Sequence, residues 1–272
     1  MEDYIGVAGD WHGNKRWADT RILDFADLGI TKIIHLGDFG VWNDNSGDKY
    51  LYRVNRVLSD NGQKIYVTLG NHEDYVRVSE FSPVLEGPDK GWLYERAYPN
   101  ILYAARGFRW EWAGTSFVSL GGANSIDRAY PHRIENFSWW SGEQISYGDV
   151  IRTREGGYAD VFLAHDCPEG VPLFGGHKAG KGNWSHDDLE YAERSRKSLR
   201  SAVDRVQPRL FLHGHYHFLA DYTTHLEDEL GNYYSLHSVG FNKDEEKDNI
   251  AVLSLPTLQL DFIDYKVRSF RP

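Results

Sequence analysis

The sequence predicts an α/β fold in which a parallel β-sheet carries polar loops at one edge. Three short apolar runs alternate with segments of helical character: 5–8, 32–36 and 64–69. Each run leads into a glycine followed by a polar residue: Gly9-Asp10, Gly37-Asp38 and Gly70-Asn71. Strands that alternate with helices are typical of parallel pairing through right-handed crossovers, which brings the loops after the strands to the same edge of the sheet.

Helices are expected to connect these strands. Ile22 and Phe25 are spaced as on the buried face of a helix over residues 17–28, which Gly29 would end. A second helix is expected over about 50–61. The apolar runs that flank these two helices are predicted to be buried strands.

Prolines punctuate the next segment, residues 77–112, so loop and short helix are expected in its first part. Three strands should follow, at 101–104, 108–112 and 115–120. The segment at about 121–155 is dense in arginine and tryptophan, and we expect it to form a substrate-facing insertion. A helix is expected at its end, over residues 143–154.

The rest of the chain continues the alternation of strands and helices. A glycine-rich loop at about 171–184 carries His177, Lys178 and Lys181 and is a candidate lid. A helix over 186–206, capped by Ser185 or Asp187, would end before Pro208. The other expected elements are strands at 159–164, 209–212, 218–222, 233–237, 250–255 and 258–265. No repeat or linker interrupts this pattern, so a single domain over residues 1–272 is expected.

Composition and charge exclude several classes of protein. The formal net charge of −10 argues against the gripping of an extended nucleic acid, because that mode of binding relies on Lys and Arg to neutralise phosphates. Cys167 is the only cysteine, so neither an internal disulfide nor a cysteine-rich zinc module is expected. The first residues lack the features of a signal peptide, and no apolar stretch is long enough to cross a membrane, so we expect a cytoplasmic protein.

Side chains able to bind metals recur at the ends of the predicted strands. The first three loops should bring together Asp10, His12, Asp38, Asn71 and His72. A histidine-rich run, residues 211–217, follows a later strand. His215 and His217 would lie on the same face of an extended chain, where both imidazoles can point at one metal centre.

Taken in order, these strand-end blocks resemble the signature of the calcineurin-like metallophosphoesterases. The blocks are Gly9-Asp10-Trp11-His12, Gly37-Asp38, Gly70-Asn71-His72-Glu73, Ala164-His165 and Gly214-His215-Tyr216-His217. The segments around Gly37 and Gly121 also resemble the small members of this family from bacteriophages and bacteria. That narrower resemblance implies that the protein is located in the cytoplasm of a bacterium or of a phage-infected cell.

The resemblance implies a fold of two facing mixed β-sheets flanked by helices, with two metal ions at the strand ends. One metal would be held by Asp10, His12, Asp38 and His217. The other would be held by Asp38, Asn71, His165 and His215, so that Asp38 bridges the two. Such a pair can hold a hydroxide nucleophile and the phosphoryl oxygens for in-line displacement, while His72 would protonate the leaving oxygen. Manganese is the expected metal, and Fe, Zn, Ni and Co are alternatives because this ligand set accepts them all.

The chain departs from the family pattern around His72. Many members carry an Asp three residues after the bridging Asp, which orients this His, but that position here is Val41. The candidate replacements are Asp44, Asp74 and Asp127. The protein Ser/Thr phosphatases also use a pair of arginines, whose positions here are Trp42 and Leu69. Without that pair for a dianionic monoester, a monoanionic phosphodiester or another small nucleotide, including cyclic ones, is the favoured substrate.

Alternatives to this function stay open. They are a phosphomonoesterase, including a protein phosphatase, a nuclease, and a binding protein that has lost catalysis. Arg128 and Arg133, together with Trp139 and Trp140, would suit the phosphate and base of a nucleotide, or would form a packed surface segment.

Four other features of the sequence are expected to be structural. His35 is expected to be a hydrogen-bonded core residue, and His213 to have a structural role. Cys167 is expected to serve packing, and residues 244–248 to form a solvated turn.

Overall fold

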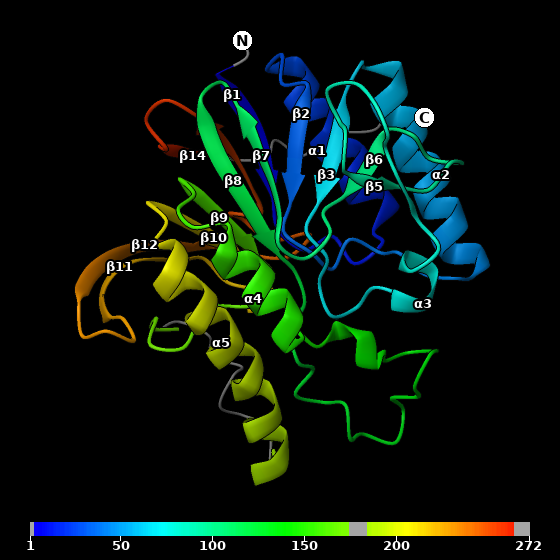
Figure 1. The fold of residues 1–272 in the computed structure, drawn as a ribbon. Coiled ribbons are helices and arrows are strands. Elements are labelled where there is room, and N and C mark those ends of the chain that lie inside the picture. Colours follow the sequence, from blue (N-terminus) through cyan, green and yellow to red (C-terminus); the bar gives the residue numbers. More distant parts are fainter. Residues whose placement is uncertain (1–2, 174–183, 264–272) are drawn as a thin grey trace.

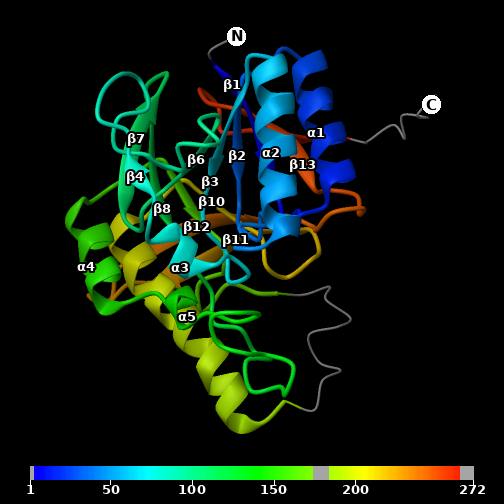
Figure 2. The ribbon, with the colours of Figure 1, turned by 90° about the vertical axis from the view of Figure 1, so that its right-hand side faces the viewer.

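Two β-sheets face each other in the computed structural model, which describes residues 3–173 and 184–263. Helices α1 (Lys15–Asp27) and α2 (Asn45–Asp60) cover the outer face of one sheet, while α4 (Tyr147–Glu155) and α5 (His186–Val206) cover the outer face of the other (Figure 1, Figure 2). The expectation of facing mixed sheets flanked by helices is therefore confirmed. Most of the predicted loop at 171–184, with His177, Lys178 and Lys181, lies outside the described residues.

The larger sheet has the spatial order β14-β13-β1-β2-β3-β6-β5-β4. Its strands are β1 (Tyr4–Ala8), β2 (Lys32–His35), β3 (Lys64–Val67), β4 (Ser82–Pro83), β5 (Leu93–Tyr94), β6 (Ile101–Tyr103), β13 (Ile250–Ser254) and β14 (Leu260–Phe262). Strands β1, β2, β3 and β6 are parallel to one another, and β13 joins β1 in antiparallel register. The crossover helices predicted from the sequence thus connect parallel strands.

The smaller sheet has the order β11-β12-β10-β9-β8-β7. Its strands are β7 (Phe108–Trp112), β8 (Thr115–Leu120), β9 (Val161–Ala164), β10 (Leu210–His213), β11 (Ala220–Glu227) and β12 (Tyr233–Gly240). Strands β8, β9, β10 and β12 are parallel, and antiparallel strands close both edges. The carboxyl ends of the parallel strands lie at one edge of each sheet.

Apolar side chains fill three layers around the two sheets. Because neighbouring residues of a strand point to opposite faces, both faces of a central strand are buried and its sequence is continuously apolar. In β2, Ile33 packs under α1 and α2, whereas Ile34 packs between the two sheets. The third layer joins the smaller sheet to α5 through residues such as Phe162 and Leu199. This packing fixes the two sheets against each other and so places their strand ends side by side.

The helix boundaries differ from the predicted ones where polar side chains cap the first turn. Helix α2 begins at Asn45 rather than near residue 50, because the Asp44 carboxylate accepts hydrogen bonds from the backbone N–H groups of Ser46 and Gly47. Helix α1 begins at Lys15 for the same reason, with Asn14 as its cap. Within the described ranges, no helix has the length and apolar character needed to span a bilayer.

The segment before α4 has little regular structure. The helix predicted over 143–154 begins only at Tyr147, where Ser146 and Asp149 form a capping box, and residues Ser141–Glu143 form a 3-10 turn, η1. Of the two candidate caps of α5, Ser185 is the one used. The short helix expected at the start of residues 77–112 is α3 (Tyr75–Val78), which begins two residues earlier. Strands β4 and β5 were not predicted, because two residues are too few to show an alternating pattern.

Candidate metal centre

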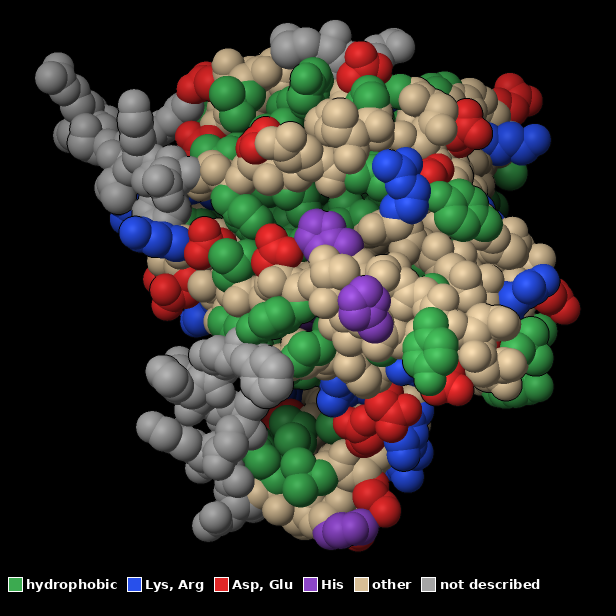
Figure 3. Space-filling view, turned by 90° about the vertical axis from the view of Figure 1, so that its left-hand side faces the viewer, with side chains coloured by type: hydrophobic (Ala, Val, Ile, Leu, Met, Phe, Trp, Pro, Cys, Tyr) green, Lys and Arg blue, Asp and Glu red, His purple; other side chains and the backbone are tan. Residues whose placement is uncertain are grey.

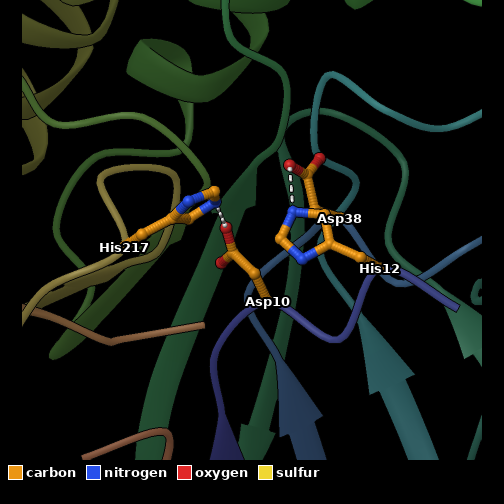
Figure 4. A group of neighbouring side chains, drawn as sticks. All are labelled: Asp10, His12, Asp38 and His217. Carbon is orange, nitrogen blue, oxygen red and sulfur yellow. Dashed lines mark ion pairs between the residues drawn. The ribbon is translucent and has the colours of Figure 1, made fainter. Parts of the chain in front are cut away.

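The polar loops that follow β1, β2, β3, β9 and β10 meet between the two sheets. Donor atoms of Asp10, His12, Asp38 and His217 all lie within 4.8 Å of one another. Figure 4 shows His217 directed at Asp10 and His12 directed at Asp38. The convergence of the strand-end side chains that the sequence predicted is thus present in the structure. Their service as metal ligands stays a prediction.

The carboxylate of Asp38 lies between two groups of histidines. Its Oδ1 is 3.3 Å from Nε2 of His165, and its Oδ2 is 3.5 Å from Nε2 of His12 and 4.0 Å from Nε2 of His72. The residue is almost completely buried. Each oxygen of Asp38 therefore faces a different side of the centre.

Asp10 anchors the histidine-rich run from the far end of the chain. Its Oδ2 lies 3.2 Å from Nε2 of His217, and its carboxylate also accepts a hydrogen bond from the backbone N–H of His215. Gly214 is needed here, because a Cβ on this residue would lie 2.1 Å from Oδ1 of Asp10. The aspartate and the run thus pack in direct contact.

On the other side of Asp38, three acceptor atoms face one another. Nδ1 of His165 lies 2.7 Å from the carbonyl of Leu36, which can only accept, so Nδ1 carries a proton. Nε2 of His165 lies 3.0 Å from Oδ1 of Asn71 and 3.3 Å from Oδ1 of Asp38. The ring of His215 lies 5.0 Å from that of His165. With His165 neutral, its Nε2 and the two oxygens have no donor among them, so either a proton on Nε2 or a bound cation can satisfy this side of the centre.

The pKa values of Asp38 and His165 also show that positive charge is favoured beside the buried carboxylate. Burial opposes the charge on Asp38, but the neighbouring histidines outweigh burial and hold the pKa of Asp38 well below its usual range. Burial alone would lower the pKa of His165, but the negative charge of Asp38 outweighs it and raises this pKa to about 10. Two buried carboxylates, four imidazoles and an amide oxygen are donors that divalent first-row metals accept. The residues present therefore fit a metal pair.

The backbone of the histidine-rich run is not extended, so the expectation for His215 and His217 is wrong in this respect. Strand β10 ends at His213, and His215 and His217 have φ angles of 70° and 57°. His12 and Asp38 also have positive φ, at 44° and 51°. Left-handed backbone costs energy in residues other than glycine and occurs preferentially at functional sites. The two imidazoles converge through this local turn and not through the alternation of a strand.

Asp244 supports the centre from a segment that was expected to be a solvated turn, and that expectation is wrong for this residue. The Asp244 carboxylate lies 3.2 Å from Nδ1 of His12 and accepts a hydrogen bond from the side chain of Asn14. A carboxylate at Nδ1 fixes the ring and leaves Nε2 directed at Asp38. Nothing in the sequence near Asp244 signals this contact, because 232 residues separate it from His12.

Glu73 holds the loops beneath the centre. Its carboxylate accepts hydrogen bonds from the backbone N–H groups of Phe39, Gly40 and Gly70. It therefore joins the loop after β2 to the loop after β3. The last residue of the Gly-Asn-His-Glu block thus holds two loops together, a role that was not predicted from the sequence.

His72 has no carboxylate partner of the kind that was expected. Within the described part of the chain, no hydrogen bond or ion pair joins it to Asp44, Asp74 or Asp127. Asp44 and Asp74 cap helices α2 and α3 instead, and Asp127 pairs with Arg133. The group next to Nδ1 of His72 is Nη1 of Arg133, at 3.5 Å.

A pocket of about 370 Å³ opens beside His72. Its lining combines the loop after β2 with the segment before α4: Trp42, Asn43, Asp44, His72, Asp74, Arg133, Asn136, Phe137, Ser138 and Trp140. Arg133, predicted to bind substrate, is thus in the pocket. Arg128 is not among the lining residues, and its guanidinium lies 3.8 Å from the centre of the Tyr191 ring.

Three further residues singled out in the sequence lie near the centre without facing it. His213 and Cys167 are buried, and Nδ1 of His213 contacts the carbonyl of Gly214. His35 is also buried, but the expectation of a hydrogen-bonded residue is wrong, because neither of its ring nitrogens has a partner among the described residues. It packs against the rings of Trp11 and Phe39, and burial lowers its pKa to about 3, so it is neutral.

The fold is a two-sheet sandwich that gathers Asp, Asn and His side chains, which are donors that metal ions accept, at its strand ends. The chain belongs to the calcineurin-like phosphoesterases, whose family model matches residues 4–219. Membership and the Asp/His cluster together indicate a hydrolase of phosphoester bonds with a dinuclear divalent metal site. No curated protein sequence matches the chain.

Solved structures share the fold at low sequence identity. The protein TT1561 of Thermus thermophilus aligns with a TM-score of 0.54 and 16% identity, over 95% of this chain and 97% of its own. A dimetal phosphatase from Danio rerio aligns with a TM-score of 0.52 and 12% identity, over 93% of this chain and 92% of its own. At such identities the likeness concerns the fold alone.

Proposed function

We propose that this chain is a dinuclear metal-dependent phosphodiesterase that hydrolyses small nucleotides, cyclic ones included. The observation that carries the proposal is the position of Asp38, whose two oxygens face His165 on one side and His12 on the other. A carboxylate in that position can bridge two cations. Family membership supports the phosphoester chemistry.

Each side of Asp38 has its own set of donors. Asp10, His12 and His217 complete the first set with Asp38, and Asn71, His165 and His215 complete the second. When bound, the metal pair supplies a nucleophilic water and positive charge for the phosphoryl oxygens. Manganese is the metal that we propose, and Fe, Zn, Ni and Co fit the same donors.

His72 is proposed to act on the leaving oxygen. Its Nδ1 faces a guanidinium nitrogen of Arg133, which can only donate. A neutral His72 therefore holds its proton on Nε2, the atom that lies 4.0 Å from Oδ2 of Asp38. From that position Nε2–H can donate a hydrogen bond to the oxygen that leaves the phosphorus and so stabilise the negative charge that develops on it.

The pocket beside His72 favours a substrate of low negative charge. Among the described residues that line it, Arg133 is the only arginine, and its guanidinium is already paired with Asp127. Asp44 and Asp74 also line the pocket. A dianionic phosphomonoester would lack the arginine pair that suits it, whereas a monoanionic diester needs less positive charge. The indole of Trp42 and the ring of Phe137 offer apolar surface to a nucleoside. The pocket volume of about 370 Å³ is within the usual range for a small-ligand site.

Extended nucleic acid is disfavoured as a substrate. The net charge is −10, and the face on the side of β11, β12 and β14 intersperses acidic with basic side chains (Figure 3). Within the described residues drawn there, no continuous basic stripe follows the surface. Binding to a polymer backbone relies on such a stripe.

A comparison of substrates tests the proposal. The protein of residues 1–272 is freed of metal with a chelator and reloaded with Mn²⁺. It is then assayed on cyclic mononucleotides, linear diesters, the matching monoesters, and single- and double-stranded DNA and RNA. We expect turnover of small diesters to exceed that of monoesters and polymers, and Asp38→Asn to abolish it. Preference for monoesters would overturn the diester assignment. Activity that survives metal removal, or an Asp38→Asn variant as active as the parent, would overturn the mechanism.

A further inference from the structure

The side chain of Asn71 is held from behind by a buried hydrogen-bonded chain. Its Nδ2 donates to Oγ of Ser125 at 2.9 Å, and Ser125 contacts Glu143 twice. The Ser125 hydroxyl bonds to Oε2 of Glu143, and the Ser125 backbone N–H donates to Oε1 at 2.8 Å. Tyr191 of α5 donates its hydroxyl to the same Oε1 at 2.9 Å. Asn71, Ser125 and Glu143 are each less than 5% exposed.

The direction of these hydrogen bonds follows from what each group can donate. A serine hydroxyl has one proton, and a carboxylate can only accept. Glu143 already accepts from the backbone of Ser125 and from Tyr191, so it also takes the proton of the Ser125 hydroxyl. The Ser125 oxygen is then left to accept, and only the NH₂ end of Asn71 can satisfy it.

This polarity determines which end of the amide faces the centre. The two ends of an asparagine amide have nearly the same shape, so hydrogen bonds and not packing choose between them. With its NH₂ group directed at Ser125, Asn71 presents Oδ1 to His165 at 3.0 Å. The opposite orientation would place an N–H donor in the centre, where it would repel a cation.

We infer that Ser125 and Glu143 are positioning residues that hold the oxygen of Asn71 toward the metal centre. The inference rests on the proposed function in assigning Asn71 to a metal. It gives the segment before α4 a role in assembling the centre, in addition to lining the pocket.

Arg106 keeps Glu143 in place. Its guanidinium donates to the backbone carbonyls of Gly121, Gly142, Glu143 and Gln144, which lie at the two ends of the segment 121–144. It also lies 5.0 Å from the centre of the Tyr75 ring, and the Tyr75 hydroxyl donates to the carbonyl of Gly70. The segment is therefore tied to the same loop that carries Asn71.

Mn²⁺ binding to the metal-free protein of residues 1–272 tests the inference without any substrate. Calorimetry gives the two affinities, and electron paramagnetic resonance reports the coupling between paired Mn²⁺ ions. We expect Ser125→Ala to weaken one Mn²⁺ site by about 10- to 100-fold, the usual effect of losing a partner that orients a ligand. Ser125→Thr, which keeps the hydroxyl, should retain both sites.

Three further variants separate positioning from general loss of structure. Ser119→Ala is the matched control, because Ser119 is a buried serine whose hydroxyl contacts Thr68 and not the centre, and we expect both sites to persist. In an Asn71→Ala background, Ser125→Ala should weaken binding by less than about 2-fold, because the amide it orients is gone. Should Ser125→Ala fail to fold, Ser125→Cys keeps the side-chain size with a poor acceptor and should show the same selective loss.

Three results would overturn the inference. Wild-type protein that binds two Mn²⁺ ions while Ser125→Ala leaves both affinities unchanged would refute it and leave the proposed function intact. An equal loss for Ser125→Ala in the presence and absence of the Asn71 amide would also refute it. Wild-type protein that binds fewer than two Mn²⁺ ions would refute both proposals.

Discussion

Nη1 of Arg133 lies 3.5 Å from Nδ1 of His72, in the place where a carboxylate was expected. The difference matters because a carboxylate would favour a charged imidazole, whereas a guanidinium disfavours it. Arg133 is itself fixed, since Asp127 accepts from its Nη2 at 2.7 Å and the carbonyl of Ser138 accepts from its Nη1 at 2.7 Å. The arginine therefore sets which nitrogen of His72 holds the proton.

Replacing Arg133 with methionine should lower kcat on a small diester by about 10-fold, part of the roughly 10²- to 10³-fold that one positioned hydrogen-bond donor contributes. The reason is that Nδ1 of His72 loses its donor and the ring loses its preferred tautomer. Steady-state kinetics would measure this, with Arg96→Met as a surface control. In a His72→Asn background the loss should vanish. A loss that persists there, with a raised KM, would show instead that Arg133 contacts the substrate.

Truncating Asp244 should weaken metal binding at the His12 side of the centre. Asp244→Ala removes the carboxylate at Nδ1 of His12, and we expect the affinity for Mn²⁺ to fall by about 10- to 100-fold. Asp244→Asn keeps an acceptor and should lose less. Glu246→Ala, an exposed acidic residue in the same segment, is the control for charge. Equal effects of Asp244→Ala and Glu246→Ala on calorimetric titrations would mean that only the overall charge matters.

A methyl group at Gly37 should disturb the centre directly. Gly37 has a φ of 100°, and a Cβ there would lie 2.4 Å from Nδ1 of His165. Gly62 also has a positive φ, 64°, but its Cβ would meet open space. Gly62→Ala should therefore cost about 1–2 kcal/mol of unfolding free energy for the left-handed backbone, and Gly37→Ala about 1–3 kcal/mol more for overpacking.

Denaturant unfolding of the two metal-free glycine variants would measure the difference, and Mn²⁺ titration would show whether Gly37→Ala alone impairs binding. The close contact with His165 would lose its importance if both variants were destabilised equally and bound Mn²⁺ alike.

Removal of metal should lower thermal stability as well as abolish activity. A ligand that binds only the folded state at 100 times its dissociation constant stabilises it by about 2.7 kcal/mol, which corresponds to about 5–10 °C in Tm for a chain of this size. Differential scanning fluorimetry of the chelated protein, with and without Mn²⁺, would measure the shift. Asp38→Asn should lose most of it. A full shift in that variant would place the metal elsewhere.

The sequence located much of the centre because its signals are local. An apolar run that ends in glycine and a carboxylate, as at Gly37-Asp38, marks the carboxyl end of a buried strand. Alternation with helices then implies parallel strands and a shared edge. Asp10, His12, Asp38, Asn71 and His72 were placed at that edge on these grounds, and the structure gathers them there. His165 was added by the family resemblance. The αββα arrangement itself came from the family resemblance and is confirmed by the two sheets.

The remaining features depend on contacts between distant loops. Arg133 beside His72, Asp244 beside His12 and Ser125 beside Asn71 join segments that are 61, 232 and 54 residues apart in the sequence. Loop sequences have no repeating pattern from which their contacts could be predicted. Their side chains form hydrogen bonds with the groups that the fold brings close to them.

The histidine-rich run illustrates the division between sequence and structure. Its composition alone predicted that imidazoles would meet at the end of a strand. The left-handed backbone of His215 and His217 was not predictable from the run, because contacts with Asp10 and neighbouring loops impose it. The strands and helices could be predicted from the sequence, because the spacing of apolar residues within each segment shows which of its faces is buried. The partners of the polar side chains were decided only by packing the two sheets against each other.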